Sequence, residues 1–490
     1  MQDPIVVVQA QEDWLSIENV VQHAVVQIVA QVGKFNWKEP YKNIEQHESR
    51  GTGFFVDDQG HIVTNAHVIN EAKVVWIHLP AMGKKVIRVK IISFCPDRDL
   101  GLLKVVDEDL SLIQQELGAI PFLSCGNSDQ VRRTDKILSL GYPLGQYRLK
   151  SSTGIISGRE SGSGISYLQM TAAVNPGSSG GPLLSVNGEV VGITVASIAN
   201  ASHIGYAIPV NEFTCIVQDM MKKKLFRKPI IGGMFHETTQ EHAKFLGNPI
   251  PTGVYIYDVL PDSLLEQAGV KQADVLYSFN GVSIDPYGEA RVDWSVEKVS
   301  LYDLISRLYI GQAVDLELYR NGEKITASFI LKEPVLYPVR MRYPDYEIID
   351  YEVIGGMVVM ELSDNHFAYL LEVAPELITY SKIENRLKSV LIVTHILPGS
   401  CVQQLRSLSA GDILKEVNGI AVSTLDDFRK MLRISLDSDF LTIKTVRNIF
   451  AVLPFRQILK KEEQLSKDFV YTISETVQEL LELIIHEKTS

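Results

Sequence analysis

Cysteine is scarce in this chain, whose 490 residues contain four: Cys95, Cys125, Cys215 and Cys401. They lie far apart in the sequence, and no Cys-x-x-Cys pair suggests a zinc or redox site. We therefore expect buried thiols and no metal site. A disulfide between Cys95 and Cys125, inside the first domain, is the alternative.

Long apolar runs and an excess of positive charge are also missing. No stretch approaches the roughly 18 apolar residues that a membrane span needs, which predicts no integral membrane segment. The formal net charge is −12, from 47 basic and 59 acidic residues, so we expect no nucleic-acid partner. A basic cluster, Lys222–Lys224 with Arg227 and Lys228, is interpreted as a solvated linker.

No targeting segment is recognisable in the first residues. No lysine or arginine precedes Lys34, and the run Ile5–Val8 is too short for the apolar centre of a signal peptide. The expectation is therefore a chain without a signal peptide.

Short runs of β-forming residues, separated by glycine-rich turns, fill residues 50–209. This pattern is typical of an all-β barrel or sandwich. Apolar residues recur at helical spacing in residues 14–32, which predicts a helix that leads into the β region. The same spacing in residues 211–221 predicts a second helix, and the basic stretch up to Pro229 marks a domain boundary.

An internal repeat organises the second half of the chain, because residues 254–284 recur as residues 391–422. Each copy has Asn-Gly between apolar β runs, beginning at Asn280 and Asn418, which predicts a type I′ hairpin in each. The tetrapeptide Ile-Gly-Gly-Met precedes both copies. Two related domains are therefore expected. Beyond Pro454, an acidic segment with one apolar face predicts a C-terminal amphipathic helix.

Three segments of the β region carry the groups that a serine needs to attack a peptide carbonyl. These groups are a base, a carboxylate that holds the base, and N–H donors for the oxyanion. Residues 175–182, Asn-Pro-Gly-Ser-Ser-Gly-Gly-Pro, place the candidate nucleophile Ser179 in a glycine-rich turn that can aim N–H groups inward. The amides of Gly177 and Ser179, with Ser178, are the candidate oxyanion hole.

The base and its carboxylate partner come earlier in the chain. His67 follows a β run that begins at His61, and the end of a strand can hold a side chain rigidly. Asp99 stands at the mouth of an apolar strand, where one carboxylate can be buried against an imidazole N–H. Asp97 is the alternative, and we favour Asp99 because it directly adjoins the apolar run. The order His, Asp, Ser is that of chymotrypsin-type enzymes, not of subtilisin or α/β hydrolases.

Together these segments resemble the HtrA/Deg family of serine proteases, over about residues 15–460. The family usually has asparagine where this chain has Ser178, and alignment on the following Gly-Gly-Pro identifies Ser179 as the nucleophile. The layout is most similar to plant-type Deg enzymes and to bacterial members with two PDZ domains. Four matching blocks, in the family's order, begin at Thr64, Asp97, Asn175 and Gly205.

The resemblance implies a mainly β protein with a chymotrypsin-like double β-barrel followed by two PDZ-like α/β domains. The expected boundaries are residues 1–225 for the protease domain with its N-terminal helix, 226–336 for the first PDZ domain, 337–458 for the second and 459–490 for the C-terminal amphipathic helix.

The primary substrate pocket of such folds lies about six residues before the serine and along the strand that follows it. None of the corresponding residues is acidic, so no counter-charge is available for a lysine or arginine side chain. This predicts cleavage after small or medium apolar residues. The expected lining residues are Ala173, Ile193, Thr194, Val195 and Ile204.

The resemblance to PDZ domains implies a loop that binds the C-terminal carboxylate of a peptide. Ile231, Gly232, Gly233 and Met234 are expected to form it in the first domain, and residues 354–357 in the second, with backbone N–H groups as donors and the peptide added as a strand. We expect peptide binding more strongly for the first domain than for the second, because the second copy has an added stretch near residues 364–387.

The family resemblance also implies an ATP-independent endopeptidase without a cofactor, which degrades unfolded or damaged proteins and peptides in protein quality control. PDZ domains would regulate activity or assembly, and a chaperone role is the alternative or additional function. Trimers or multiples of trimers are implied, with Phe35 and Trp37 suited to a subunit contact or to packing on their own domain. The periplasm or cell envelope is expected after processing, with an organelle lumen or the cytoplasm as alternatives.

Overall fold

The computed structural model describes residues 14–42, 45–162, 165–195 and 204–487. These divide into two units, which are described separately. Unit 1 comprises Met1–Val32 and His47–Val335, and unit 2 comprises Gly33–Gln46 and Leu336–Ser490.

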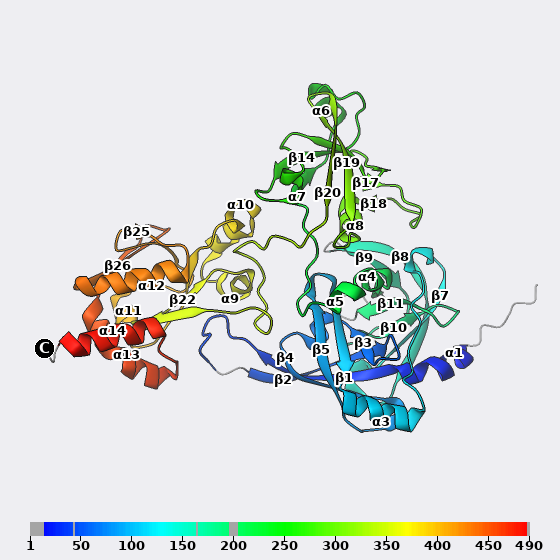
Figure 1. Ribbon diagram of the computed structural model, residues 1–490, viewed down its shortest axis with the longest axis horizontal. Helices are drawn as coiled ribbons and strands as arrows, with labels where there is room; N and C mark the ends of the chain where they lie inside the picture. The colour runs from blue at the N-terminus through cyan, green and yellow to red at the C-terminus, as the bar shows by residue number, and fades with distance from the viewer. Residues whose placement is uncertain (1–13, 43–44, 163–164, 196–203, 488–490) are drawn as a thin grey trace, which may run out of the picture. The chain divides into compact units, whose positions relative to one another are not determined.

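Two closed six-stranded antiparallel barrels form the first part of unit 1 (Figure 1), which confirms the predicted mainly β, chymotrypsin-like fold. Phe54 and Leu102 of the first barrel share one hydrophobic core with Leu140 and Ile193 of the second. The strand order of the first barrel is β1 (Val25–Lys34), β2 (Glu45–Phe55), β3 (His61–Thr64), β6 (Leu100–Val105), β5 (Ile87–Cys95) and β4 (Ala72–His78). That of the second is β10 (Pro182–Leu184), β11 (Val190–Val195), β12 (Gly205–Pro209), β9 (Ile165–Met170), β8 (Lys150–Gly162) and β7 (Lys136–Gly141).

The helix predicted over residues 14–32 is wrong beyond its first half. Helix α1 (Trp14–Val21) is followed by a 3₁₀ turn, and β1 begins at Val25. Valine and isoleucine dominate the start of β1, and β-branched side chains favour an extended backbone that is buried on both faces. The helix predicted over residues 211–221 is likewise two short helices, α4 (Asn211–Thr214) and α5 (Val217–Met220).

The internal repeat forms two similar sheets. The first repeat domain, in unit 1, has the strand order β13 (Gly233–His236), β14 (Val254–Val259), β15 (Val275–Phe279), β19 (Ala313–Arg320) and β20 (Glu323–Ile330), with β16 (Val282–Ser283) beside β15 and helices α7 (Leu264–Gln267) and α8 (Leu301–Ser306). The second repeat domain, in unit 2, has the order β21 (Tyr351–Ile354), β22 (Met357–Glu361), β23 (Leu391–Ile396), β24 (Ile413–Val417), β26 (Phe440–Thr445) and β27 (Phe450–Pro454), with β25 (Ile420–Ala421) beside β24 and helices α11 (Cys401–Leu405) and α12 (Leu425–Ile434).

Both predicted Asn-Gly hairpins are confirmed. Asn280 and Gly281 have φ values of 49° and 78°, and Asn418 and Gly419 have 50° and 75°, as a type I′ turn requires. The likeness also extends beyond the repeated residues. Arg320 pairs with the buried Asp274 in the first copy, and Arg447 pairs with the buried Asp412 in the second.

The two Ile-Gly-Gly-Met tetrapeptides are offset by one residue in space. The carbonyl of Gly232 accepts the N–H of Leu260, whereas the equivalent carbonyl in the second copy is that of Gly356, which accepts from Leu397. The position of Ile231 in the first loop is therefore held by Gly355 in the second. An alignment of the two tetrapeptides by residue type misses this offset, because the backbone hydrogen bonds define which positions are equivalent.

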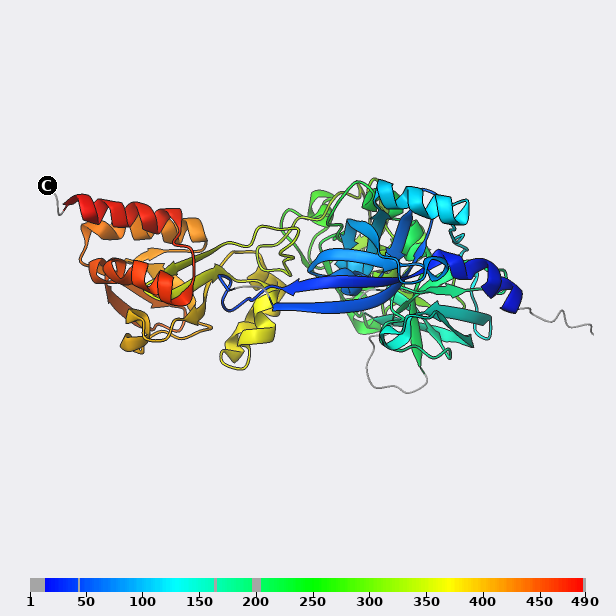
Figure 2. The ribbon, with the colours of Figure 1, turned by 90° about the horizontal axis from the view of Figure 1, so that it is seen from below.

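Two helices follow the second repeat domain where the sequence predicted one over residues 459–490. Helix α13 (Phe455–Phe469) is followed by Val470, which has a left-handed φ of 57°, and α14 (Glu475–Glu487) turns back. Figures 1 and 2 show α14 beside α12 and α13. Apolar side chains of both C-terminal helices join the core of the second repeat domain.

All four cysteines lie in described segments and none is bridged, so the alternative of a disulfide between Cys95 and Cys125 is wrong. The prediction of buried thiols holds for Cys95 alone, because Cys125 and Cys401 are partly exposed and Cys215 is exposed. Burial raises the pKa of the Cys95 thiol to about 12. Trp37 is 4% exposed and packs in unit 2, edge to face with His366, so it is not available for the subunit contact considered above. No helix of the described segments is long and apolar enough to cross a membrane.

Candidate active site

His67 projects from a short helix at the end of strand β3. Helix α2 (Ala66–Ile69) begins directly after Asn65, and its residues Ala66, Val68 and Ile69 are buried in the first barrel. Because these three apolar side chains point inward, the remaining residue of the turn, His67, is exposed. The apolar pattern of the helix thus determines which side chain faces solvent.

Asp99 holds the imidazole of His67 and its backbone at the same time. Its Oδ2 lies 2.8 Å from Nδ1 of His67, and its Oδ1 accepts the backbone N–H of His67 at 2.9 Å. The side-chain amide of Asn65 donates to the carbonyl of Asp99 at 3.0 Å. With a carboxylate at Nδ1, the proton of the neutral ring resides there, which leaves Nε2 as the basic nitrogen.

The alternative carboxylate, Asp97, has a different partner. Its Oδ2 accepts the backbone N–H of Lys228 at 2.9 Å. Asp99 has a left-handed φ of 52°, which turns the chain between the two acids. The geometry therefore favours Asp99 over Asp97 as the partner of His67.

Ser179 lies in a turn that is fastened to the first barrel. Its carbonyl accepts the N–H of Thr52 at 2.8 Å, and the N–H of Gly180 donates to the carbonyl of Thr194 at 2.8 Å. A side chain at Gly180 has no space, because its Cβ would lie 2.1 Å from the oxygen of Thr52 and 3.1 Å from the nitrogen of Asn65. The serine turn therefore contacts the strand end that precedes His67.

The three candidate oxyanion donors are not equivalent. The N–H of Ser178 donates to the carbonyl of Asn175 at 2.9 Å and so closes the turn itself. Gly177 has a φ of 97°, which only glycine adopts readily. The bonded amide of Ser178 is therefore removed from the predicted oxyanion donors, and the amides of Gly177 and Ser179 stay a prediction.

Thr52 is a structural partner of this site that the sequence analysis missed. Its buried hydroxyl donates to the carbonyl of Gly177 at 2.7 Å and accepts the N–H of Tyr142 at 3.0 Å, and its own carbonyl accepts the hydroxyl of Thr64. Thr52 therefore links the serine turn to strand β3. The only signal in the sequence is a hydroxyl residue between two glycines.

Arg98, which directly precedes Asp99, was missed as well. Its side chain is 0% exposed and forms an ion pair with Glu212. It also donates to the carbonyl of Ser306, at the end of α8, at 2.5 Å. The loop of Asp99 is thus joined to the first repeat domain within unit 1.

The five predicted pocket residues separate into two groups. Ile193 and Thr194 are fully buried within the second barrel, and Val195 is nearly so. Ala173 is exposed, and Ile204 is 40% exposed. Of the five predicted pocket residues, only Ala173 and Ile204 therefore have side chains that a substrate could contact. The side chains of the three β11 residues belong to the core of the barrel.

The predicted carboxylate loop precedes an open sheet edge in the first repeat domain. Gly232 has a φ of 91° and lies so close to Ser263 that its Cβ would be 2.0 Å from the serine Cβ. Strand β13, which begins at Gly233, is the edge of its sheet. Phe235 of β13 packs edge to face on Tyr302 of α8, with ring centroids 6.2 Å apart.

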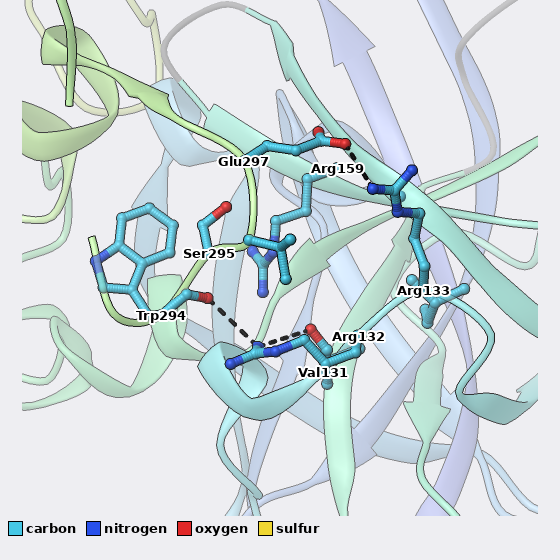
Figure 3. A pocket seen from close by; sticks show the side chains of 10 residues that line it. Val131, Arg132, Arg133, Arg159, Trp294, Ser295 and Glu297 are labelled. Atoms are coloured by element: carbon cyan, nitrogen blue, oxygen red, sulfur yellow. Dashed lines mark hydrogen bonds and ion pairs between the residues drawn. The ribbon is translucent and has the colours of Figure 1, made fainter. Parts of the chain in front are cut away.

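A small cleft lies between the second barrel and the loop before α8 (Figure 3). Its volume is about 40 Å³, which admits water but no substrate. Arg132 donates to the carbonyl of Trp294 at 3.4 Å, and Arg133 pairs with Glu297 at 3.0 Å. The guanidinium of Arg307 stacks 3.4 Å from the ring centre of Trp294. Arginine side chains of the second barrel thus meet the loop before α8 at this cleft, within unit 1.

Comparisons with known proteins identify the kind of domain that contains this candidate site. Residues 51–193 match the family of trypsin-like peptidase domains. A probable periplasmic serine endoprotease, DegP-like, of Marinomonas sp. (strain MWYL1) is 27% identical over 421 residues, 84% of this chain and 80% of the relative. A DegP-like endoprotease of Chlamydia trachomatis is 30% identical over 284 residues, 56% of this chain and 52% of its own length.

Two further matches are also to serine proteases. Periplasmic serine endoprotease DegP of Escherichia coli (strain K12) is 26% identical over 391 residues, 78% of this chain and 71% of the relative. Among solved structures, the HtrA-type protease AlgW with a decapeptide is 21% identical, with a TM-score of 0.50, and matches 65% of this chain and 98% of its own. At this identity the structural match supports the fold alone.

Proposed function

Because the chain belongs to the HtrA/Deg family of serine endopeptidases, we propose that His67, Asp99 and Ser179 are its catalytic triad. The observation that carries the proposal is the pair of contacts from the Asp99 carboxylate to Nδ1 and to the backbone N–H of His67. Nε2 of His67 takes the proton of the Ser179 hydroxyl as its oxygen attacks the carbonyl carbon of the scissile peptide bond.

The remaining steps follow from the same groups. The amides of Gly177 and Ser179 stabilise the negative oxygen of the tetrahedral intermediate. His67 then gives its proton to the leaving amine, the C–N bond breaks, and an acyl-enzyme remains on Ser179. A water molecule, deprotonated by His67, attacks the acyl carbon, and the bond from that carbon to Oγ of Ser179 breaks. His67 returns the proton to Oγ, which releases the acid product and restores the serine. Asp99 stabilises the imidazolium of His67 each time it forms.

The substrates that we propose are unfolded or damaged proteins, degraded without ATP in the periplasm or cell envelope. The support is the similarity to DegP-like periplasmic endoproteases. We further propose cleavage after small or medium apolar residues, because Ala173 and Ile204, the two candidates with open surface, carry no charge.

We propose that the first repeat domain binds peptide C-termini at Ile231, Gly232, Gly233 and Met234, and so regulates the protease. The support is the open edge of β13 beside α8, together with the glycine loop. A peptide can add to such an edge as a further strand while loop N–H groups bind its carboxylate. The contact from α8 to Arg98 offers a route from this groove to Asp99.

Digestion of casein without ATP tests the function. The wild-type chain and Ser178→Ala should cleave casein at similar rates, whereas Ser179→Ala should lose cleavage by about 10,000-fold or more. A folded, stable protein should resist all three. Equal turnover by wild type and Ser179→Ala would refute the triad, and a need for ATP would refute the proposed class.

A further inference from the structure

The second repeat domain has one strand more than the first at the edge where a peptide would bind. All four residues of β21 pair with β22 in antiparallel register, from Tyr351 opposite Met360 to Ile354 opposite Met357. The equivalent of β22 in the first domain, β13, is an open edge. Addition of a strand to such an edge is how peptides bind sheets of this kind.

The direction of β21 is also that of a peptide ligand. Its C-terminal end, Ile354, leads into the loop Gly355-Gly356, which has φ values of 61° and 87°. A bound peptide would likewise direct its terminal carboxylate at this loop. Here the chain continues through the loop, so no terminal carboxylate of β21 is present.

Helix α12 holds β21 in place from the other side. Arg429 pairs with Asp350 at 2.7 Å and with Glu352 at 2.8 Å, and it donates to the carbonyl of Tyr351 at 3.1 Å. Glu352 is 1% exposed. The strand is therefore fastened between β22 and α12.

A carboxylate reaches the loop from helix α13. The N–H of Gly355 donates to Oε2 of Glu462 at 2.9 Å, and the hydroxyl of Tyr471 donates to Oε1 at 2.6 Å. Glu462 is fully buried. Gly355 stands at the position of Ile231 in the first loop, so this N–H is equivalent to one proposed there for a peptide carboxylate.

The absence of a side chain at Gly355 admits helix α13. A Cβ on Gly355 would lie 2.8 Å from Cγ2 of Ile458, which fills this space. Ile458 and Glu462 are four residues apart and lie on one face of the helix. The pair thus supplies an apolar group and a carboxylate to the loop.

We propose that the peptide site of the second repeat domain is filled by its own chain, with β21 as the strand and Glu462 as the carboxylate. The inference rests on the proposed peptide binding by the first repeat domain. Under this proposal each chain has one open peptide site, formed by residues 231–236 beside α8. The equivalent site of the second repeat domain is occupied by that domain's own strand and helix.

Photo-crosslinking of the full chain tests this inference. The probe is a pool of decapeptides that carry a benzophenone and end in a free Val, Leu, Ile or Phe carboxylate, and amidated peptides are the control. In a Ser179→Ala background the label should map to residues 231–236 and 301–306. When Arg429→Ala/Glu462→Ala is added to Ser179→Ala, the label should also appear in residues 354–361, at a level at least about 10-fold above that of Ser179→Ala alone. Lys430→Ala/Glu463→Ala, at the exposed neighbours of these two residues, is the matched control. Its labelling should equal that of Ser179→Ala alone.

Several outcomes overturn the inference. Labelling of residues 354–361 in Ser179→Ala alone contradicts the inference. Absence of new label in Arg429→Ala/Glu462→Ala also contradicts it, provided that this variant has a native near-UV circular dichroism spectrum. A second measurement applies even if that variant unfolds. Amide hydrogen exchange over residues 351–357 should be about 100-fold slower than over residues 230–236, and equal rates overturn the inference. Absence of label in the first domain would instead contradict the proposed function.

Discussion

The carboxylate of Asp99 fixes His67 in two ways, by the imidazole and by the backbone, whereas Asp97 binds the backbone of Lys228. We expect Asp99→Asn to lower kcat by about 10,000-fold, because an amide at this position favours the wrong tautomer of the histidine. Asp97→Asn is the matched control and should retain most activity. Rates on a chromogenic peptide measure both, and equal losses would contradict the assignment.

Thr52 offers a second test at the scale of single residues. Thr52→Val removes the hydroxyl between the Gly177 carbonyl and the Tyr142 N–H but keeps the shape of the side chain. We expect kcat to fall by about 10- to 100-fold with KM little changed, because the oxyanion donors shift slightly. Thr52→Ser, which keeps the hydroxyl, should restore kcat. Failure of serine to rescue would assign Thr52 a packing role only.

His67 and Ser179 could be predicted from the sequence because their neighbours form contiguous motifs. Thr52 and Arg98 could not, since their roles depend on contacts with residues more than 100 positions away. Ile193 was predicted as pocket lining from its place after the serine, yet it is buried in the core. Position along a strand does not determine which face is open.

At the scale of elements, the buried pair of Arg98 and Glu212 joins the Asp99 loop to α4 and α8. Arg98→Ala leaves a buried, unpaired carboxylate, so we expect unit 1 to lose about 3–5 kcal/mol of unfolding free energy. Arg98→Met/Glu212→Leu removes both charges and should recover most of this loss. Urea unfolding followed by tryptophan fluorescence measures both variants, and an unchanged midpoint for the single variant would contradict the role of the pair.

Unit 2 contains a buried histidine that should make it sensitive to acid. Burial lowers the pKa of His366 to about 3, while Ser363 donates its backbone N–H to Nδ1. In the unfolded chain the pKa is about 6.5, so the unfolded state binds more protons between these values and stability falls as pH falls below about 6.5. We expect a loss of about 3 kcal/mol between pH 6.5 and 4 that His366→Gln lacks. Thermal unfolding at several pH values measures this, and parallel curves would contradict it.

The elements themselves were partly predictable. The Asn-Gly hairpins follow from local backbone preference and are confirmed. Residues 25–32 were predicted as helix but form a strand. The prediction failed because a strand that is buried on both faces is apolar at almost every position, so its apolar residues also fit helical spacing. Strand β21 lies before the repeated residues, so comparison of the two copies could not reveal it. The break at Val470 depends on packing of α14 and carries no proline or glycine signal.

For the molecule as a whole, the proposals predict regulation through the first repeat domain. Peptides that end in a free apolar carboxylate should raise the kcat of casein cleavage several-fold, and amidated peptides should not. Arg98→Met/Glu212→Leu should keep its basal rate within about threefold but lose this response, because α8 no longer contacts the Asp99 loop. A flat response of the wild-type chain would contradict regulation by this groove.

Covalent labelling with a fluorophosphonate during casein digestion tests the central claim most directly. The account predicts one adduct per chain, located on Ser179 by mass spectrometry, with loss of casein cleavage in proportion to labelling. An adduct on Ser178 or another serine, or cleavage that persists after complete labelling, would contradict Ser179 as the nucleophile of this endopeptidase.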